Sequence, residues 1–229
     1  MLTLRDHNVE DYASLRDMDS TDVAILDDAD RACLDELGNH LVSTDAWQRF
    51  AIWLLHKHFE PSPGELFVER VSTSPRGTET KPIERCADLA VTSMRFDPDV
   101  RRGVGVIGME YADPADFGGT ALLGDDDAAV LAGVAKRLRA RGKTERFGVR
   151  MIRDPLGLRA DELLVETCDI TRRRLQCSVD KRDDVHVESV ETTWNWRPAG
   201  PAVMQYCMMM CGYDGNGNHY IEGHTIMPD

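Results

Sequence analysis

The chain has 229 residues and a formal net charge of −13, from 27 Lys and Arg against 40 Asp and Glu. This length provides for one large domain or two small ones, each with its own core. The excess of acid argues against general binding to the phosphate backbone of nucleic acid, which requires Lys and Arg to replace counterions. We therefore do not expect nucleic acid as a partner.

The apolar runs and the cysteines of the sequence indicate the cellular compartment of the protein. No apolar run approaches the roughly 20 residues that a membrane-spanning helix needs, and the acidic start MLTLRDHNVEDY is unlike a signal peptide. We therefore expect a cytoplasmic protein with no membrane partner. The six cysteines are sparse and irregularly spaced, so we expect reduced thiols rather than a disulfide scaffold.

Charge is unevenly distributed along the chain. Residues 1–29 carry eight acids and two Arg, a net charge of −6, and we treat them as an acidic N-terminal arm. Residues 136–153 carry eight bases and one Glu, a net charge of +7. Two solvated surfaces would explain both. The alternative is that the arm folds over the basic stretch from Lys136 to Arg153, which would otherwise attract an anionic ligand.

An internal repeat organises the rest of the chain. At a shift of 97 residues, 30–70 lies over 127–167 without a gap. The match resumes at a shift of 100, where 91–98 lies over 191–198. Ten positions of the first block are identical: Asp30/Asp127, Ala32/Ala129, Leu34/Leu131, Leu41/Leu138, Arg49/Arg146, Phe50/Phe147, Glu65/Glu162, Leu66/Leu163, Val68/Val165 and Glu69/Glu166. We predict a duplication, with module 1 at 30–126 and module 2 at 127–229; chance similarity of two amphipathic segments is the alternative.

Each module is predicted to begin with two helices. Apolar residues at i, i+1, i+4 and i+8 indicate one helix face starting at Cys33 and another at Val130. Apolar spacing also predicts a second helix over 50–55 and over 147–152, which prolines then end.

Strands are predicted to follow the helices in each module. We expect them at 65–71 and 162–168, in a returning strand at 174–179, and around 91–98 and 191–198. Trp194 and Trp196 alternate in the last of these and lie over Met94 and Phe96, which favours core positions.

This order of elements predicts an α+β fold. We expect an antiparallel sheet with the helices packed on one face and a pseudo-two-fold relation between the modules. A crevice between related modules is a natural ligand site, so we expect a small-molecule ligand there. Homo-oligomerisation is left open.

The first candidate site is His56-Lys57-His58-Phe59-Glu60, which module 2 lacks. His56 and Glu60 would share a helix face at i, i+4, a spacing suited to a general acid/base pair or to metal binding. In an extended chain, His56 and His58 could still chelate. The simpler interpretation is that Lys57 and one His face solvent while the other His lies at a helix C-terminus.

The second candidate is a set of metal ligands near the C-terminus: Cys207, Cys211, His219 and His224. These residue types suit zinc or another transition metal. If 201–211 is a helix, Cys207 and Cys211 share a face. If it is a strand, as the repeat indicates, they lie roughly 13 Å apart and serve as core.

Two further motifs are weaker. Residues 214–222 resemble a calcium loop, but His219 replaces the Gly at its sixth position and Thr225 the Glu at its twelfth. Gly103, Gly105 and Gly108 fit G-x-G-x-x-G, but a β-like run continues through them where a dinucleotide site needs a helix.

Two classes of function remain. The first is a small-molecule enzyme, with a transition metal as a candidate cofactor, that uses His56, His58 and Glu60 together with the Cys/His set in the cleft between the modules. The second is a non-catalytic ligand-binding or interaction protein, such as a regulator or an inhibitor, because no complete catalytic signature is present.

Overall fold

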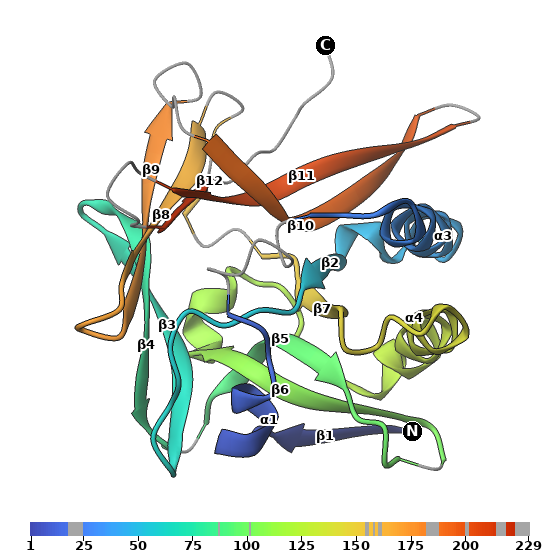
Figure 1. Ribbon diagram of the computed structural model, residues 1–229, viewed down its shortest axis with the longest axis horizontal. Helices are drawn as coiled ribbons and strands as arrows, with labels where there is room; N and C mark the ends of the chain where they lie inside the picture. The colour runs from blue at the N-terminus through green and yellow to red at the C-terminus, as the bar shows by residue number, and fades with distance from the viewer. Residues whose placement is uncertain are drawn as a thin grey trace.

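A computed structural model describes residues 1–17, 25–86, 88–100, 102–153, 156–157, 159, 162–181, 188–199, 202–213 and 219–222. Two long helices in this part of the chain lie side by side at one end of the molecule, opposite strands β3, β4 and β9 (Figure 1). These helices are α3 (Asp28–Ser43) and α4 (Ala128–Arg141).

Capping defines where the helices begin and end. Asp27 caps α3 by accepting a hydrogen bond from the Asp30 amide at 2.6 Å, while the Asp30 side chain accepts one from the Asp27 amide. Gly142 ends α4 in the left-handed conformation at φ 65°, which glycine adopts without steric cost. A short helix, α1 (Val9–Ala13), has a capping box of its own between Asn8 and Asp11.

The remaining elements are strands and short 3₁₀ turns. The turns are η1 (Ala46–Gln48), η2 (Pro114–Phe117) and η3 (Asp125–Asp127). The strands are β1 (Leu2–Asp6), β2 (Phe50–Leu54), β3 (Glu65–Thr73), β4 (Arg76–Glu84), β5 (Ala90–Phe96), β6 (Val104–Ala112), β7 (Phe147–Met151), β8 (Glu162–Asp169), β9 (Arg174–Lys181), β10 (Glu188–Ala199), β11 (Ala202–Tyr213) and β12 (His219–Glu222).

The twelve strands of the described chain form one sheet in the order β1-β6-β3-β4-β9-β8-β12-β11-β10-β2-β7-β5. An additional β5–β6 pairing links the end of this order back to β6. The fold therefore combines helices with one large sheet, as expected. The sheet is not wholly antiparallel, because β6 pairs in parallel with both β1 and β3.

The predicted second helix is wrong in both modules. Residues 50–54 and 147–151 form β2 and β7, which pair antiparallel with each other. All five residues of β2 are buried, so apolar side chains point to both faces of the strand. Such a continuous apolar run has no two-residue alternation, and periodicity alone does not distinguish it from a buried helix.

Strand positions correspond between the two halves of the chain. β2 and β7 are offset by 97 residues at both ends, and the start of β8 is offset from that of β3 by the same number. Pairings correspond too: Ser93 pairs with Arg150 as Thr193 pairs with Trp53. Both β5 and β10 have a register shift at equivalent positions, after Val91 and Glu191.

Strands of the two sequence halves interleave in the sheet. β7 lies between β5 and β2, and β2 lies between β7 and β10. A second junction joins β4 to β9, where Thr78 pairs with Cys177. Segments 30–126 and 127–229 therefore share one sheet.

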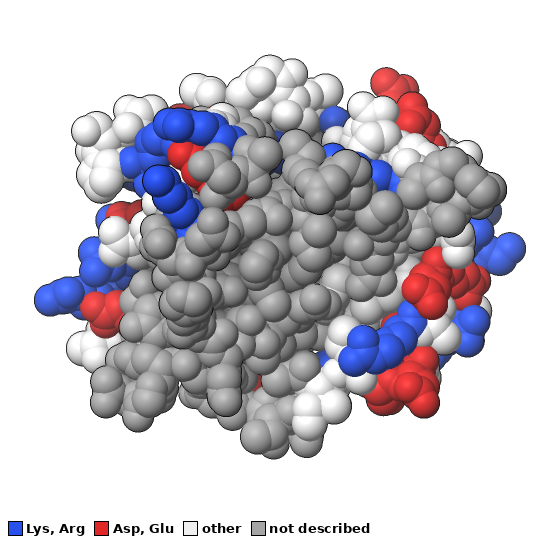
Figure 2. Space-filling model, turned by 90° about the horizontal axis from the view of Figure 1, so that it is seen from above, with Lys and Arg blue, Asp and Glu red and all other residues white. Residues whose placement is uncertain are grey.

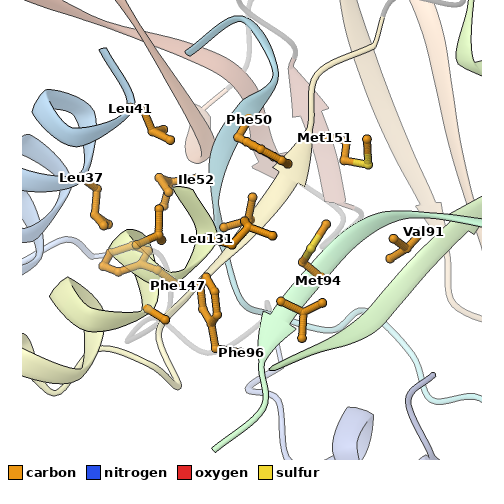
Figure 3. Close-up of a cluster of buried hydrophobic side chains, with 14 of the residues drawn as sticks. Leu37, Leu41, Phe50, Ile52, Val91, Met94, Phe96, Leu131, Phe147 and Met151 are labelled. Carbon is orange, nitrogen blue, oxygen red and sulfur yellow. The ribbon is translucent and has the colours of Figure 1, made fainter. Parts of the chain in front are cut away.

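The main core lies where the helices meet the sheet. Side chains from α3, α4, β2, β5 and β7 converge there, including Leu37, Leu131, Ile52, Phe96 and Phe147 (Figure 3). Trp194 and Trp196 are also in this core and at most 2% exposed, which confirms the prediction for them. Burial of side chains this large contributes roughly 1.5 to 3 kcal/mol each.

A second buried cluster joins α1 to the sheet. It comprises Tyr12, Leu15, Trp53, Leu55, Phe59, Phe67, Ile107, Met109, Cys168 and Leu175. The N-terminal arm is thus anchored twice, by β1 in the sheet and by α1 in this cluster.

Candidate functional site

The segment 56–60 forms a compact cluster that is not helical. His56 is 4% exposed, its Nδ1 lies 2.7 Å from the Leu54 carbonyl oxygen, and its ring meets that of His58 edge-on at 4.9 Å between centroids. Glu60 does not share a helix face with His56. It pairs instead with Lys57, whose Nζ lies 2.5 Å from Glu60 Oε1 and donates to the Ala13 carbonyl at 2.9 Å. The chain bends at His58 and Phe59, and Lys57 is 7% exposed, so the interpretation with a solvent-facing Lys57 and a His at a helix C-terminus is wrong.

The C-terminal set is described only through its backbone. Residues 202–213 form strand β11, so the strand alternative holds for Cys207 and Cys211. In the β11–β12 ladder Cys211 pairs with Ile221, and His219 pairs with Tyr213. The side chains of Cys207, Cys211 and His219, and all of His224 and of 214–218, lie outside the described residues. Among the described side chains, no three His, Cys, Asp or Glu come together as metal ligands.

The glycine motif is part of a strand. Gly105 and Gly108 lie within β6, which continues to Ala112, so the helix that a dinucleotide fingerprint requires does not follow.

The basic stretch is largely paired with acids. Lys143 lies 2.6 Å from Asp30 Oδ1, and Arg146 contacts Asp30 at 3.4 Å. Arg141 contacts Glu36 at 3.0 Å. On the face seen in Figure 2, the described acidic and basic side chains lie intermixed. Anion binding by this stretch stays a prediction.

In the described part of the chain, residues near the end of the arm contact the basic stretch. Arg146 donates to the Ile25 carbonyl at 2.9 Å, and Lys143 lies 3.6 Å from Asp27. Residues 2–6 instead form β1 beside β6. Residues 18–24 lie outside the described part of the chain.

Two arginines of this stretch form a buried ion network with two glutamates of the sheet. Arg150 donates to Glu110 at 2.9 Å and to Glu69 at 3.2 Å, and Arg153 also pairs with Glu69. Ser93 donates to Glu110 at 2.6 Å. The side chains of Glu69 and Glu110 are 9% and 11% exposed, so charges are balanced within a largely dry site.

His7, directly after β1, is a different kind of buried group. It is 7% exposed, and its Nδ1 lies 3.0 Å from the carbonyl oxygen of Gly108 in β6. A carbonyl oxygen only accepts, so Nδ1 carries the proton and the neutral ring keeps its lone pair on Nε2. Within the described chain, the buried Nε2 has no hydrogen-bond partner.

Burial keeps this imidazole neutral. Desolvation lowers the pKa of His7, and the Gly108 hydrogen bond and the Asp11 charge offset part of this effect. The ring stacks on Phe67 with centroids 6.1 Å apart and lies 5.5 Å from Tyr12. Nε2 is thus a hydrogen-bond acceptor held in place by aromatic neighbours.

His7 lines a pocket of about 460 Å³, a volume within the range of small-molecule sites. The start of α1, the start of β3 and the end of β4 meet there. Its lining residues are His7, Asn8, Val9, Glu10, Pro63, Gly64, Glu65, Leu66 and Arg85.

Most charged groups at the pocket are already paired. Glu65 accepts from Arg173 of the β8–β9 turn at 2.6 Å, and Arg85 forms an ion pair with Asp6. The hydroxyl of Tyr111 lies 2.8 Å from the other oxygen of Asp6. Glu10 is exposed and has no ion-pair partner among the described residues.

Sequence reasoning missed His7 because the arm was considered only for its charge. The alternation in Leu2-Thr-Leu-Arg-Asp6 and the spacing of Asn8 and Asp11 are signals for a strand and a helix cap. Neither signal reveals that a carbonyl more than 100 positions away fixes the tautomer of His7.

No helix in the described residues is long and apolar enough to cross a membrane. Comparisons of the chain with protein-family models, curated proteins and solved structures found no match.

Proposed function

We propose that this protein binds a small molecule in the His7 pocket, without catalysing a reaction on it. The observation that carries the proposal is that His7, whose buried Nε2 has no hydrogen-bond partner in the described chain, is one of the residues that line a pocket of ligand size. An unsatisfied buried acceptor costs about 1 to 3 kcal/mol. A ligand that donates an O–H or N–H to Nε2 recovers this cost, and Pro63 and Leu66 supply apolar surface beside it.

The groups that surround the His7 ring favour binding over catalysis. A general base needs a nucleophile or an orienting acid within hydrogen-bond distance. Within the described chain, the rings around His7 are those of Tyr12, Phe67 and Tyr111, and the Tyr111 hydroxyl is engaged by Asp6 and the Gly108 carbonyl. These groups position the imidazole, and none of the described side chains is hydrogen-bonded to its Nε2 as a partner for proton transfer.

The test uses two probes of nearly equal shape, benzyl alcohol and benzyl methyl ether, which differ in the hydroxyl donor. We expect the alcohol to bind at least fivefold more tightly in NMR titrations and to shift the His7 Nε2 resonance. His7→Phe keeps an aromatic ring and removes the acceptor, so it should abolish the preference for the alcohol. Equal binding of both probes to the wild type, or an unchanged Nε2 resonance, would contradict the proposal.

A metal-dependent enzyme is the second candidate, and two observations favour it. His56 holds its Nδ1 on a backbone carbonyl, a contact that also orients many metal-bound histidines, and its ring lies against that of His58. The ladder also sets His219 opposite Tyr213, two positions from Cys211.

The metal content of protein purified without an affinity tag tests this second candidate. Stoichiometric zinc, copper or iron that is lost in both His56→Gln and Cys211→Ser would support it. A metal-free protein that takes up no zinc on dialysis would exclude it.

We also infer that the two modules arose by duplication and are related by a pseudo-two-fold axis between β2 and β7. The offset of 97 residues and the equivalent pairings of Ser93 with Arg150 and Thr193 with Trp53 support this inference. The pocket is lined by residues of the arm and of module 1, so we place the ligand there and not between the modules.

A further inference from the structure

We propose that Arg173, in the β8–β9 turn of module 2, is a positioning residue for the His7 pocket, because it fixes the loop from Glu60 to Glu65 that forms one wall of that pocket. Contact of the turn with the loop and binding of a ligand should then favour each other. This inference rests on the proposed function and assigns the regulation of the same site.

The loop 60–65 supplies Pro63, Gly64 and Glu65 to the lining of the pocket. Ser62, Pro63 and Gly64 are exposed, and Gly64 has a φ of 87°, a conformation that glycine adopts without steric cost. Burial therefore does little to fix this part of the wall. Its position depends on polar contacts at the two ends of the loop.

One guanidinium holds both ends of the loop. At one end, Oε2 of Glu65 accepts from Nη2 of Arg173 at 2.6 Å and from the Ser62 amide at 2.6 Å. At the other end, the Glu60 carbonyl accepts from Nη2 of Arg173 at 2.6 Å and from its Nε at 3.2 Å. The hydrogen bond from Arg173 lowers the pKa of Glu65, so this pair is charged near neutral pH.

The turn that carries Arg173 belongs to a hairpin that lies beside β4 (Figure 1). β9 pairs with β4 as far as Leu175 and Thr80, and the turn 170–173 lies just beyond this last pair. Arg173 has a φ of 50°, in the left-handed region that residues other than glycine enter at a cost. The contacts of its side chain with the loop offset this cost.

The experiment measures the affinity of the full chain for benzyl alcohol by NMR titration. Arg173→Met keeps a long side chain and removes the donors, so the loop should leave its binding position part of the time and the affinity should fall about three- to tenfold. Arg173→Lys restores the charge without the guanidinium fork and should recover part of this loss.

The matched control is Arg172→Met in the same turn. The Arg172 side chain is 73% exposed and contacts Asp169 within the turn. This variant should leave the affinity for benzyl alcohol unchanged.

A fourth variant separates positioning from general stability. Arg173→Gly suits the left-handed backbone, so its midpoint of thermal unfolding should lie above that of Arg173→Met, while its affinity should fall as far. Hydrogen exchange of the Arg85 amide, which donates to the Gly64 carbonyl at 3.0 Å, should be several-fold faster in both variants than in the wild type.

Three results would overturn the inference: wild-type affinity in Arg173→Met, unchanged exchange of the Arg85 amide, or an affinity that follows the unfolding midpoint rather than the presence of the guanidinium. The proposed function survives each of them, because it depends on binding to the wild type. If benzyl alcohol does not bind to the wild type, the proposed function fails and this inference fails with it.

Discussion

Arg49 holds Asp127 through two parallel hydrogen bonds, from Nε to Oδ1 at 2.5 Å and from Nη2 to Oδ2 at 2.7 Å. The same guanidinium donates to the carbonyls of Ala121 and Leu122. At the equivalent positions, offset by 97 residues, Arg146 contacts Asp30. Each arginine therefore contacts the aspartate of the other segment, as the proposed two-fold relation would require.

Arg49→Lys should destabilise the protein by about 2 kcal/mol, because an ammonium group cannot replace the two-pronged contact with Asp127. Arg146→Lys should cost about half as much, since Lys143 also holds Asp30 at 2.6 Å. Urea unfolding of both variants measures the difference. Equal losses of unfolding free energy in the two variants would mean that the two-pronged contact of Arg49 with Asp127 is no stronger than the contact of Arg146 with Asp30.

These pairs explain why the sequence repeat was informative. Asp30, Asp127, Arg49 and Arg146 are four of the residues shared between the copies, and each arginine pairs with one of the two aspartates. Which aspartate each arginine contacts was not predictable, because sequence identity does not tell contacts within a module from contacts between modules.

Gly38→Ala should destabilise the protein even though alanine is the better helix former by about 1 kcal/mol. A Cβ at Gly38 would lie 2.3 Å from Nε1 of Trp196, which is 2% exposed and closely packed. Overpacking of this kind costs about 1 to 3 kcal/mol, so the net effect is a loss. Thermal unfolding measures it.

A second substitution tests the cause of that loss. Trp196→Phe replaces the indole that the added methyl group would meet with a smaller ring. The Gly38→Ala change should therefore cost less in the Trp196→Phe background than in the wild type. An identical cost in both backgrounds would rule out the contact with Trp196 as the reason.

Arg150→Met should cost about 3 kcal/mol, because it leaves Glu110 and Glu69 buried with a counter-ion lost. Arg139→Met, an exposed substitution on α4, should change the free energy of unfolding by no more than about 0.5 kcal/mol. Urea unfolding compares the two. A loss below about 1 kcal/mol for Arg150→Met would show that water solvates the two carboxylates.

Stability should fall on acidification, in part through His7. Burial lowers the pKa of His7 in the folded state, so as pH falls below the unfolded value near 6.5 the unfolded chain takes up the proton first. The free energy of unfolding therefore decreases as pH falls from that point towards the folded pKa.

His7→Phe removes this contribution. Between about pH 7.5 and about pH 5.5, the variant should lose about 1 kcal/mol less stability than the wild type. Burial also lowers the pKa of His40. His40 therefore contributes a similar dependence of stability on pH in both proteins and serves as an internal reference. Parallel pH profiles would contradict the assignment of a neutral His7.

The prediction of a second helix in each module was wrong for a physical reason that the local sequence does not contain. Phe50-Ala-Ile-Trp-Leu54 is apolar on both sides because α3 and α4 pack near one face of the sheet and the cluster around Trp53 covers the other. The first helices were predictable, because Cys33, Leu34, Leu37 and Leu41 face a single side. The strands at 50–54 and 147–151 depend on pairing between residues far apart in the sequence, and so does the hydrogen bond between His7 and Gly108.

Interleaved strands constrain how this protein can respond to a ligand. Because β5, β7, β2 and β10 alternate between the two halves of the chain, hinge closure of one half on the other would break backbone hydrogen bonds at both junctions. The His7 pocket is walled instead by α1, five residues long and joined to the sheet through Tyr12 and Leu15. Ligand entry and release should therefore proceed by local opening of this short helix, at rates set by its own stability rather than by that of the whole fold.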